Sequence, residues 1–321
     1  MIVSLVLIIT GFASLIFGAN WLVGGASSLA KKNNISDLVI GLTIVAFGTS
    51  TPEFIINIFA SANGNTEIAI GNILGSNIAN ILLILGVSAI IYPLATKNNT
   101  VWKEIPFMLL ASVMLGILVN DMRIDNNLFS GLTRIDGLVL LAFFIVFLYY
   151  TFGISKITGD QAAEDTEIKE FSYLKSSIFI ISGLLGLMIG GKWIVDGAVK
   201  IAELFHVSQS LIGLTVVAIG TSLPELATSA MAAYKKQTDI AIGNVVGSNI
   251  FNIFWVLGFS SLIRPLPFSA KNDIDIAMTI FSSTLLFLIL FIGKKHIIEK
   301  WQGVLLVMVY IAYLMYLITN G

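Results

Sequence analysis

The chain has 321 residues, of which 56% are hydrophobic and only 12% are charged. Soluble domains carry about 25% charged residues, so this composition excludes an ordinary soluble protein. The formal net charge of -1 gives no electrostatic reason to expect nucleic acid as a partner, and the absence of cysteine excludes disulfides and thiolate metal sites.

Apolar windows of about 20 residues, long enough to cross ~30 Å of hydrocarbon as a helix, recur along the whole chain. The sequence therefore predicts an all-α polytopic membrane protein with ten transmembrane helices. In chain order, the predicted spans are residues 3–25, 37–62, 68–92, 102–120, 131–152, 174–197, 209–233, 240–264, 273–293 and 300–319.

The lysines and arginines of the predicted loops are distributed unequally between the two sides of the membrane. Twelve, including Lys31 and Lys235, fall on one side, whereas five, including Arg123 and Arg264, fall on the other. Because cytoplasmic loops carry the excess of basic residues, the richer side is predicted to be cytoplasmic. We therefore expect a multi-pass protein of the cell membrane with both termini extracytoplasmic.

One segment of the chain occurs twice. Residues 41–86 and 213–258 share 25 identical residues in 46 aligned positions, without a gap and at a constant offset of 172. Trp21 and Trp193 are separated by the same offset. Internal similarity of this kind indicates a duplicated structural unit.

The duplication divides the chain into residues 1–154, a short cytoplasmic linker at 155–172, and residues 173–321. Each half contains five predicted spans, an odd number, so the second half enters the membrane from the opposite side. We therefore predict two inverted-topology five-helix repeats. This arrangement is typical of secondary transporters, whose binding site lies near the membrane midplane between the repeats.

A polar segment interrupts the second and seventh predicted spans. It reads Gly-Thr-Ser-Thr-Pro-Glu from Gly48 to Glu53 and Gly-Thr-Ser-Leu-Pro-Glu from Gly220 to Glu225. Because proline removes a backbone donor, we expect both helices to break here and the carbonyls of residues 46–49 and 218–221 to lose their helical partners. Inside a membrane such carbonyls need another partner, which a bound cation supplies.

The two glutamates of this segment are the strongest candidates for function. A carboxylate at the centre of a membrane helix costs at least ~2.5 kcal/mol, so an intramembrane glutamate indicates a functional site by default. A proline kink or a buried hydroxyl alone is more often structural, but the repeated combination favours an ion site. Ca2+ prefers about 6–8 oxygen ligands, and each glutamate shares a helical face with two hydroxyls. These candidates are Glu53 with Thr49 and Ser50, and Glu225 with Thr221 and Ser222.

The third and eighth spans carry a second duplicated motif, Gly-Asn-x-x-Gly-Ser-Asn-x-x-Asn, which starts at Gly71 and Gly243. The serine and the last asparagine of each copy are four residues apart and share a helical face. We interpret them as neutral oxygen ligands beside the carboxylates: Ser76, Asn80, Ser248 and Asn252. The remaining asparagines are interpreted as hydrogen-bonding groups between helices: Asn72, Asn77, Asn244 and Asn249.

Together these paired segments resemble the two alpha repeats of the Ca2+/cation antiporter superfamily, and most closely those of prokaryotic sodium/calcium exchangers. The resemblance implies a central site on the second, third, seventh and eighth helices, with long first and sixth helices that slide to alternate access. It implies that Glu53 and Glu225 bind Ca2+ together with the backbone oxygens of Thr49 and Thr221. It further implies Na+ subsites on neighbouring groups: Ala46, Ser50, Ser76, Ala218, Ser222 and Ser248.

One position departs from part of that superfamily. Some members have Asp where this chain has Asn252, so the predicted centre contains two carboxylates and not three. This weakens the case for K+ co-transport, which in the superfamily accompanies an additional acidic residue.

We therefore expect a secondary active antiporter that exchanges Na+ for Ca2+, with the electrogenic three-to-one stoichiometry that the resemblance implies. Two alternatives stay open: a cation/H+ antiporter on the same scaffold, and a cation channel with an oxygen-lined constriction. The sequence has no metalloprotease motif and no phosphate-binding loop, so we expect neither an enzyme nor direct use of ATP. The expected partners are Na+, Ca2+ and the lipid bilayer, with no cofactor and no obligatory protein partner.

Overall fold

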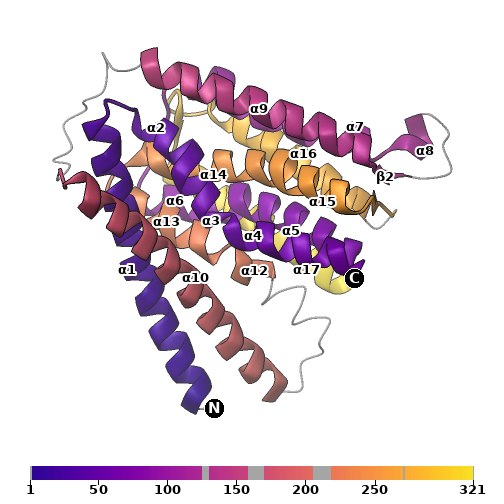
Figure 1. The fold of residues 1–321 in the computed structure, drawn as a ribbon, viewed down its shortest axis with the longest axis horizontal. Coiled ribbons are helices and arrows are strands. Elements are labelled where there is room, and N and C mark those ends of the chain that lie inside the picture. The colour runs from indigo at the N-terminus through magenta and orange to yellow at the C-terminus, as the bar shows by residue number, and fades with distance from the viewer. Residues whose placement is uncertain (1, 125–129, 158–169, 205–217, 270–271, 321) are drawn as a thin grey trace.

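The structure is a computed structural model that describes residues 2–124, 130–157, 170–204, 218–269 and 272–320. The described chain is almost entirely helical (Figure 1), which confirms the all-α class. Among the described residues, seven helices are long and apolar enough to cross a membrane, or eight if the bent second span is counted as one. The predicted span 209–233 begins outside the described residues, and span 273–293 corresponds to a helix of 17 residues.

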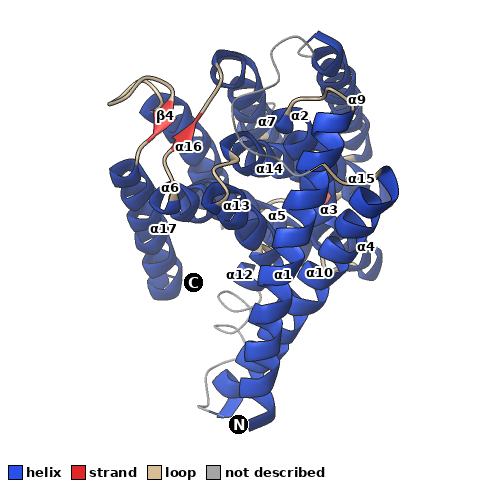
Figure 2. Cartoon of the chain, turned by 90° about the vertical axis from the view of Figure 1, so that its left-hand side faces the viewer, coloured by secondary structure: helices blue, strands red, loops and turns tan. Residues whose placement is uncertain are grey.

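The longest helices are α1 (Ile2–Lys32) and α10 (Tyr173–Leu204), the first helix of each half. They pack against each other and project from the remaining helices (Figures 1 and 2). Glycines permit their close approach, since a Cβ atom on Gly18 or Gly183 would lie 2.8 Å from the backbone oxygen of the other. No side chain fits at this crossing, so the two helices meet backbone to backbone.

The second span is broken as the proline predicts. It consists of α2 (Asp37–Ile40), the π-helical segment η1 (Gly41–Val45), α3 (Ala46–Thr49) and α4 (Thr51–Asn63), with a bend of 46° at Ser50. The seventh span shows the same break at Ser222, between α12 (Ala218–Thr221) and α13 (Leu223–Tyr234). Ser50 and Ser222 have nearly the same backbone angles, φ -84° and ψ 7° against φ -87° and ψ 5°.

The third and eighth spans form the centre of the molecule. They are α5 (Thr66–Ala79), η2 (Asn80–Leu85) and α6 (Gly86–Ile91), and α14 (Thr238–Ile250), η6 (Phe251–Leu257) and α15 (Gly258–Ile263). Their most apolar windows are 78% and 94% buried, against 28–39% for the other long apolar helices among the described residues. The π-helical segments η2 and η6 occupy matching positions, and neither was predicted from the sequence. Such segments are frequent at functional sites.

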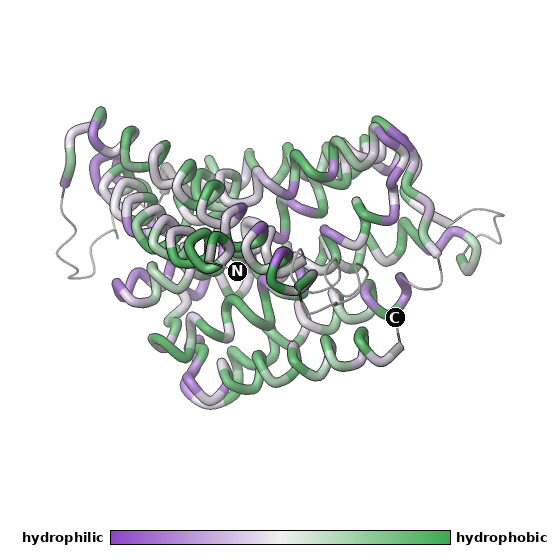
Figure 3. The backbone as a smooth tube through the Cα atoms, turned by 90° about the horizontal axis from the view of Figure 1, so that it is seen from below, coloured by the Kyte–Doolittle hydropathy of each residue, from purple (hydrophilic) through white to green (hydrophobic). Residues whose placement is uncertain are grey.

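The remaining helices surround this centre. They are η3 (Thr100–Glu104), α7 (Ile105–Leu118), α8 (Asp121–Ile124), α9 (Arg134–Ile157), α16 (Asp273–Ile289) and α17 (Lys300–Asn320). Hydrophobic residues predominate along the peripheral helices (Figure 3), and large apolar side chains such as Ile145 and Phe152 are exposed. This distribution fits a surface in contact with lipid rather than water.

Two short antiparallel sheets among the described residues join the halves. Strand β1 (Leu94–Ala95) pairs with β4 (Ile297–Ile298), and β2 (Gly131–Leu132) pairs with β3 (Leu266–Pro267). Because β1 and β3 are 172 residues apart, the two pairings are equivalent by the duplication.

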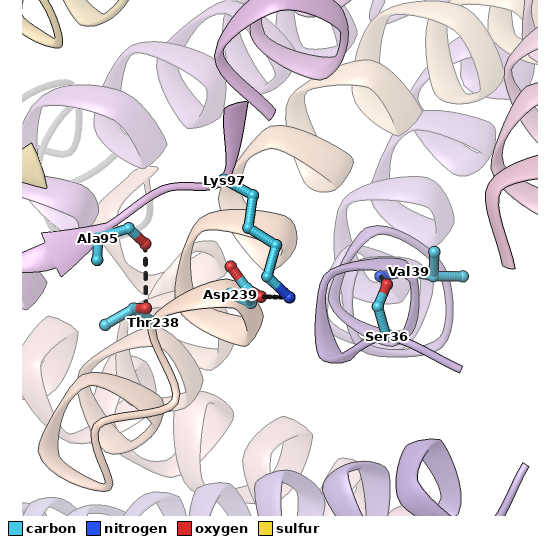
Figure 4. Close-up of polar contacts among 6 residues, drawn as sticks. All are labelled: Ser36, Val39, Ala95, Lys97, Thr238 and Asp239. Carbon is cyan, nitrogen blue, oxygen red and sulfur yellow. Dashed lines mark hydrogen bonds and ion pairs between the residues drawn. The ribbon is translucent and has the colours of Figure 1, made fainter. Parts of the chain in front are cut away.

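The two sheets lie at opposite ends of the eighth span. The Thr238 hydroxyl donates to the Ala95 carbonyl at 3.1 Å, and Lys97 pairs with Asp239 at 2.8 Å, so β1 lies at the start of α14 (Figure 4). Strand β3 follows the end of α15, after 26 helical residues. A helix of that length spans roughly 39 Å, so the two sheets are separated by about the thickness of a membrane.

Candidate ion-binding site

Glu53 and Glu225 lie in the first turns of α4 and α13, directly after the two breaks. Each is only 1% exposed, and the two carboxylates are close enough to interact electrostatically. A prolyl residue precedes each glutamate in the first helical turn, where its missing N–H is no loss. The partial positive charge of a helix N-terminus favours a carboxylate at this position.

The serines of the motif reach across to the opposite half. The Ser50 hydroxyl donates to Glu225 Oε1 at 3.1 Å, and the Ser222 hydroxyl donates to Ser76 Oγ at 3.3 Å. Thr221 and Ser76 lie beside the Glu53 carboxylate, but neither oxygen of Glu53 has a hydrogen-bond partner among the described residues. The two carboxylates therefore differ in their surroundings.

The threonines direct their hydroxyls toward asparagines of the opposite half. Thr49 donates to Asn244 Oδ1 at 3.0 Å, and Thr221 donates to Asn72 Oδ1 at 3.4 Å. These hydrogen bonds join each threonine to the opposite half, and the backbone role expected for Thr49 and Thr221 stays a prediction.

The expectation that the carbonyls before the break lose their partners is wrong for Ala46. The Ala46 carbonyl accepts from the Ser50 backbone N–H at 3.0 Å, and the Phe47 carbonyl accepts from the Thr51 hydroxyl at 2.9 Å. The helix continues to Ser50, and the donor that Pro52 lacks is the one that would face Gly48, four residues earlier. Ala218 begins α12, but its side chain lies outside the described part of the chain.

The asparagines of the third and eighth spans form a network between the two central helices. Asn77 and Asn249 each donate a side-chain N–H to the other's backbone carbonyl, at 3.4 and 3.2 Å. Asn80 Nδ2 donates to Asn249 Oδ1, and Asn252 Nδ2 donates to Asn77 Oδ1, both at 2.9 Å. The interpretation of Asn72, Asn77, Asn244 and Asn249 as groups that join helices is confirmed by these bonds and those of the threonines.

Helix packing brings the predicted ligands toward the glutamates. The segment η6, which carries Asn252, packs against α4 with Glu53, and η2, which carries Asn80, packs against α13 with Glu225. Several buried oxygens of the predicted set have no hydrogen-bond partner among the described residues: both of Glu53, Glu225 Oε2, Asn80 Oδ1, Asn252 Oδ1 and Ser248 Oγ. A set of carboxylate, amide and hydroxyl oxygens suits a hard cation such as Ca2+ or Na+.

Two further buried or half-buried carboxylates were not singled out from the sequence. The Tyr150 hydroxyl donates to Glu104 Oε1 at 2.7 Å, and the Tyr313 hydroxyl donates to Asp275 Oδ1 at 2.6 Å. Glu104 and Asp275 are 171 residues apart, as are Ser112 and Ser283, which hydrogen-bond to each other at 3.0 Å. An alignment with one gap would have revealed this extension of the duplication. The two carboxylate–tyrosine pairs join the fourth helix of each half to the fifth, whereas the serine pair joins the two fourth helices.

Comparison with known proteins gives a consistent result. A family described as sodium/calcium exchanger protein matches residues 3–153 and 175–319. The putative antiporter CaxA of Alkalimonas amylolytica is 36% identical to this chain, and the alignment covers 98% of each protein. The sodium/calcium exchanger MaX1 of Methanosarcina acetivorans is 32% identical, also with 98% of each chain covered.

A solved structure of the sodium-calcium exchanger NCX_Mj, soaked with 2.5 mM Na+ and 0.1 mM Ca2+, has the same fold. It is 36% identical, covers 97% of each chain and superposes with a TM-score of 0.83. The similarity therefore extends over both halves of the chain.

Proposed function

The chain belongs to the sodium/calcium exchanger protein family, and we propose that it exchanges Na+ for Ca2+ at a site built on Glu53 and Glu225. It is a multi-pass membrane protein of the Ca2+/cation antiporter superfamily. The observation that carries the proposal is the pair of fully buried glutamates with unpartnered oxygens, surrounded by neutral oxygen groups.

Burial makes these carboxylates costly unless a positive charge accompanies them. An isolated ionised carboxylate in an apolar interior is strongly unfavourable, and the described residues supply no cationic partner to either glutamate. A bound Ca2+ offsets two negative charges, and several Na+ ions do the same. Because both ions use the same carboxylates, we propose that they compete for the site. We also propose that the site changes from one side of the membrane to the other only when it is occupied.

We further propose that the protein has ten transmembrane helices in two inverted five-helix repeats. The positions of the two equivalent sheets support this, because β1 and β3 lie at opposite ends of the eighth span. Equivalent elements at opposite membrane faces require that the halves have opposite orientations. With the basic loops on the cytoplasmic side, both termini are extracytoplasmic.

For transport, we propose that α1 and α10 slide across the central helices to open the site to one side at a time. The glycine crossing supports movement of the two helices as one unit, because it packs α1 and α10 backbone to backbone. The ratio implied by the family resemblance is three Na+ for one Ca2+, which moves one net charge per cycle.

The primary experiment is uptake of radioactive Ca2+ into proteoliposomes loaded with Na+. We expect uptake that requires an outward Na+ gradient and increases when the interior is made positive. At a 3:1 ratio, three positive charges leave for every two that enter, so a negative interior opposes each cycle. Uptake that is slowed by an interior-negative potential therefore supports 3:1 exchange.

Other outcomes identify the alternatives. Uptake driven by a pH gradient in the absence of Na+ indicates cation/H+ exchange, and flux without any counter-ion indicates a channel. Uptake indifferent to the Na+ gradient would contradict the proposed function.

A further inference from the structure

We propose that Asn77 and Asn249 are positioning residues that determine which atom of the Asn252 and Asn80 amides faces the ion site. This inference rests on the proposed function, since Asn80 and Asn252 are taken as ion ligands. A side-chain amide carries an acceptor oxygen and a donor NH2 group of similar size. Only the oxygen attracts a cation, so the orientation of each amide decides whether it contributes to binding.

The orientation of Asn252 follows from a backbone carbonyl, which can only accept hydrogen bonds. The Asn249 carbonyl lies 3.4 Å from Asn77 Nδ2, so the NH2 group of Asn77 must face it and Oδ1 must point away. That Oδ1 atom lies 2.9 Å from Asn252 Nδ2. An acceptor there requires the NH2 group of Asn252, which leaves Asn252 Oδ1 on the other side, without a partner among the described residues.

The equivalent hydrogen bonds, which begin at the Asn77 carbonyl, orient Asn80 in the same way. The Asn77 carbonyl accepts from Asn249 Nδ2 at 3.2 Å, so Asn249 Oδ1 faces Asn80 Nδ2 at 2.9 Å. Asn80 Oδ1 is then the remaining atom, and it too has no partner among the described residues. We call the four residues Asn77, Asn80, Asn249 and Asn252 the asparagine relay.

Burial of the asparagine relay favours one orientation of the Asn80 and Asn252 amides over the reversed one. Each of the four side chains is at most 1% exposed, so water cannot replace a lost bond. Reversing Asn252 would bring two oxygens together at 2.9 Å and turn an NH2 group toward the site. A buried polar group left without its partner carries its full desolvation penalty, which keeps the reversed form sparsely populated. The relay thereby presents only oxygen to the ion from the two central helices.

The relay assigns each positioning residue to the amide of the opposite half, which a double-mutant cycle tests. We expect Asn77→Leu to raise the KM for Ca2+ by about tenfold, as for loss of one oriented ligand, with a smaller effect on the maximal rate. In an Asn252→Ala background, Asn77→Leu should not raise the KM for Ca2+ any further. In an Asn80→Ala background, it should raise the KM by the full factor. Asn249→Leu should show the reverse dependence.

Three variants keep the test decisive. Asn77→Asp retains an oxygen that accepts from Asn252 but loses the donor to the Asn249 carbonyl, so its KM for Ca2+ should rise by less than that of Asn77→Leu. Ser112→Ala removes another buried hydrogen bond between the halves and serves as a matched control with an unchanged KM. If Asn77→Leu does not fold, as judged by size-exclusion chromatography, Asn249→Leu carries the same comparison, and Asn77→Asp still tests it.

The measurements separate the relay from the proposed function. Sodium dependence of the parent protein tests the function, whereas the KM ratios test the relay with whichever counter-ion drives uptake. An Asn77→Leu protein with unchanged KM, an equal increment in both alanine backgrounds, or a rise in Asn77→Asp as large as in Asn77→Leu would each overturn the proposal.

Discussion

Glu225 and Glu53 occupy the same motif in the two halves, yet their carboxylates have different partners. Glu225 accepts a hydrogen bond from Ser50, whereas Glu53 has two oxygens without a partner among the described residues. The backbone at the two breaks is nearly identical, so the difference does not arise locally. It arises because each serine reaches into the opposite half, where Ser50 meets Glu225 and Ser222 meets Ser76.

This comparison shows that duplication preserves the backbone more closely than the hydrogen bonds. Glu53 is the carboxylate whose burial is least offset by the protein, so it gains most from a bound cation. The two glutamates therefore have different chemical surroundings in this structure, although the motifs that contain them match.

The largest expected effect comes from neutralising either glutamate. We expect Glu53→Gln and Glu225→Gln each to lower Na+-driven Ca2+ uptake at subsaturating Ca2+ by at least about 100-fold, because a buried charge loses its counter-charge. Glu67→Gln, at an exposed carboxylate, is the control. Full activity in one of the two variants would show that only one glutamate belongs to the site, and the comparison would lose its basis.

The close contact between the second and eighth spans allows a test of the packing between the halves. A Cβ atom on Gly247 would lie 2.7 Å from the Leu42 carbonyl, so Gly247→Ala requires the second and eighth spans to separate. We expect a loss of about 1–3 kcal/mol in stability, measured by thermal unfolding in detergent. Gly24→Ala, where the nearest atoms are 3.8 Å away or more, should be tolerated. Equal melting temperatures for the two variants would contradict this view of the crossing.

The serines distinguish the two carboxylates directly. Ser50→Ala removes a hydrogen bond to a charged group and should raise the KM for Ca2+ by about tenfold. Ser222→Ala removes a longer bond between two hydroxyls and should change it by no more than about threefold. Equal effects, measured in the same uptake assay, would indicate that the asymmetry is absent during transport.

The smallest effect is expected at the ends of the central helices. Asp239 pairs with Lys97, whereas its counterpart Glu67 has no ion pair among the described residues. Asp239→Asn should lower stability by at most about 1 kcal/mol, and Glu67→Gln should leave it unchanged within error, both by thermal unfolding. A larger loss in Glu67→Gln than in Asp239→Asn would reverse this part of the comparison.

Much of the fold and the composition of the site could be predicted from the sequence. The apolar runs indicated the helices, the prolines predicted the breaks at Ser50 and Ser222, and the 172-residue offset identified matching motifs. The division of asparagines between structural and site roles also followed from helical spacing, and the hydrogen bonds agree for Asn77 and Asn249. The π-helical segments η2 and η6 were not predicted, because no residue pattern marks their hydrogen-bond register.

The sequence by itself determined the membrane class, the duplication and the residue types of the candidate site, because apolar length, proline chemistry and repeat spacing are local properties of the chain. Only the tertiary structure decided which serine bonds to which carboxylate and which atom of Asn80 and Asn252 is left free. Those bonds join residues about 170 positions apart, so they depend on how the two halves pack against each other. The physical reason is that an amide or hydroxyl takes its orientation from the partner it meets, and that partner belongs to the other half.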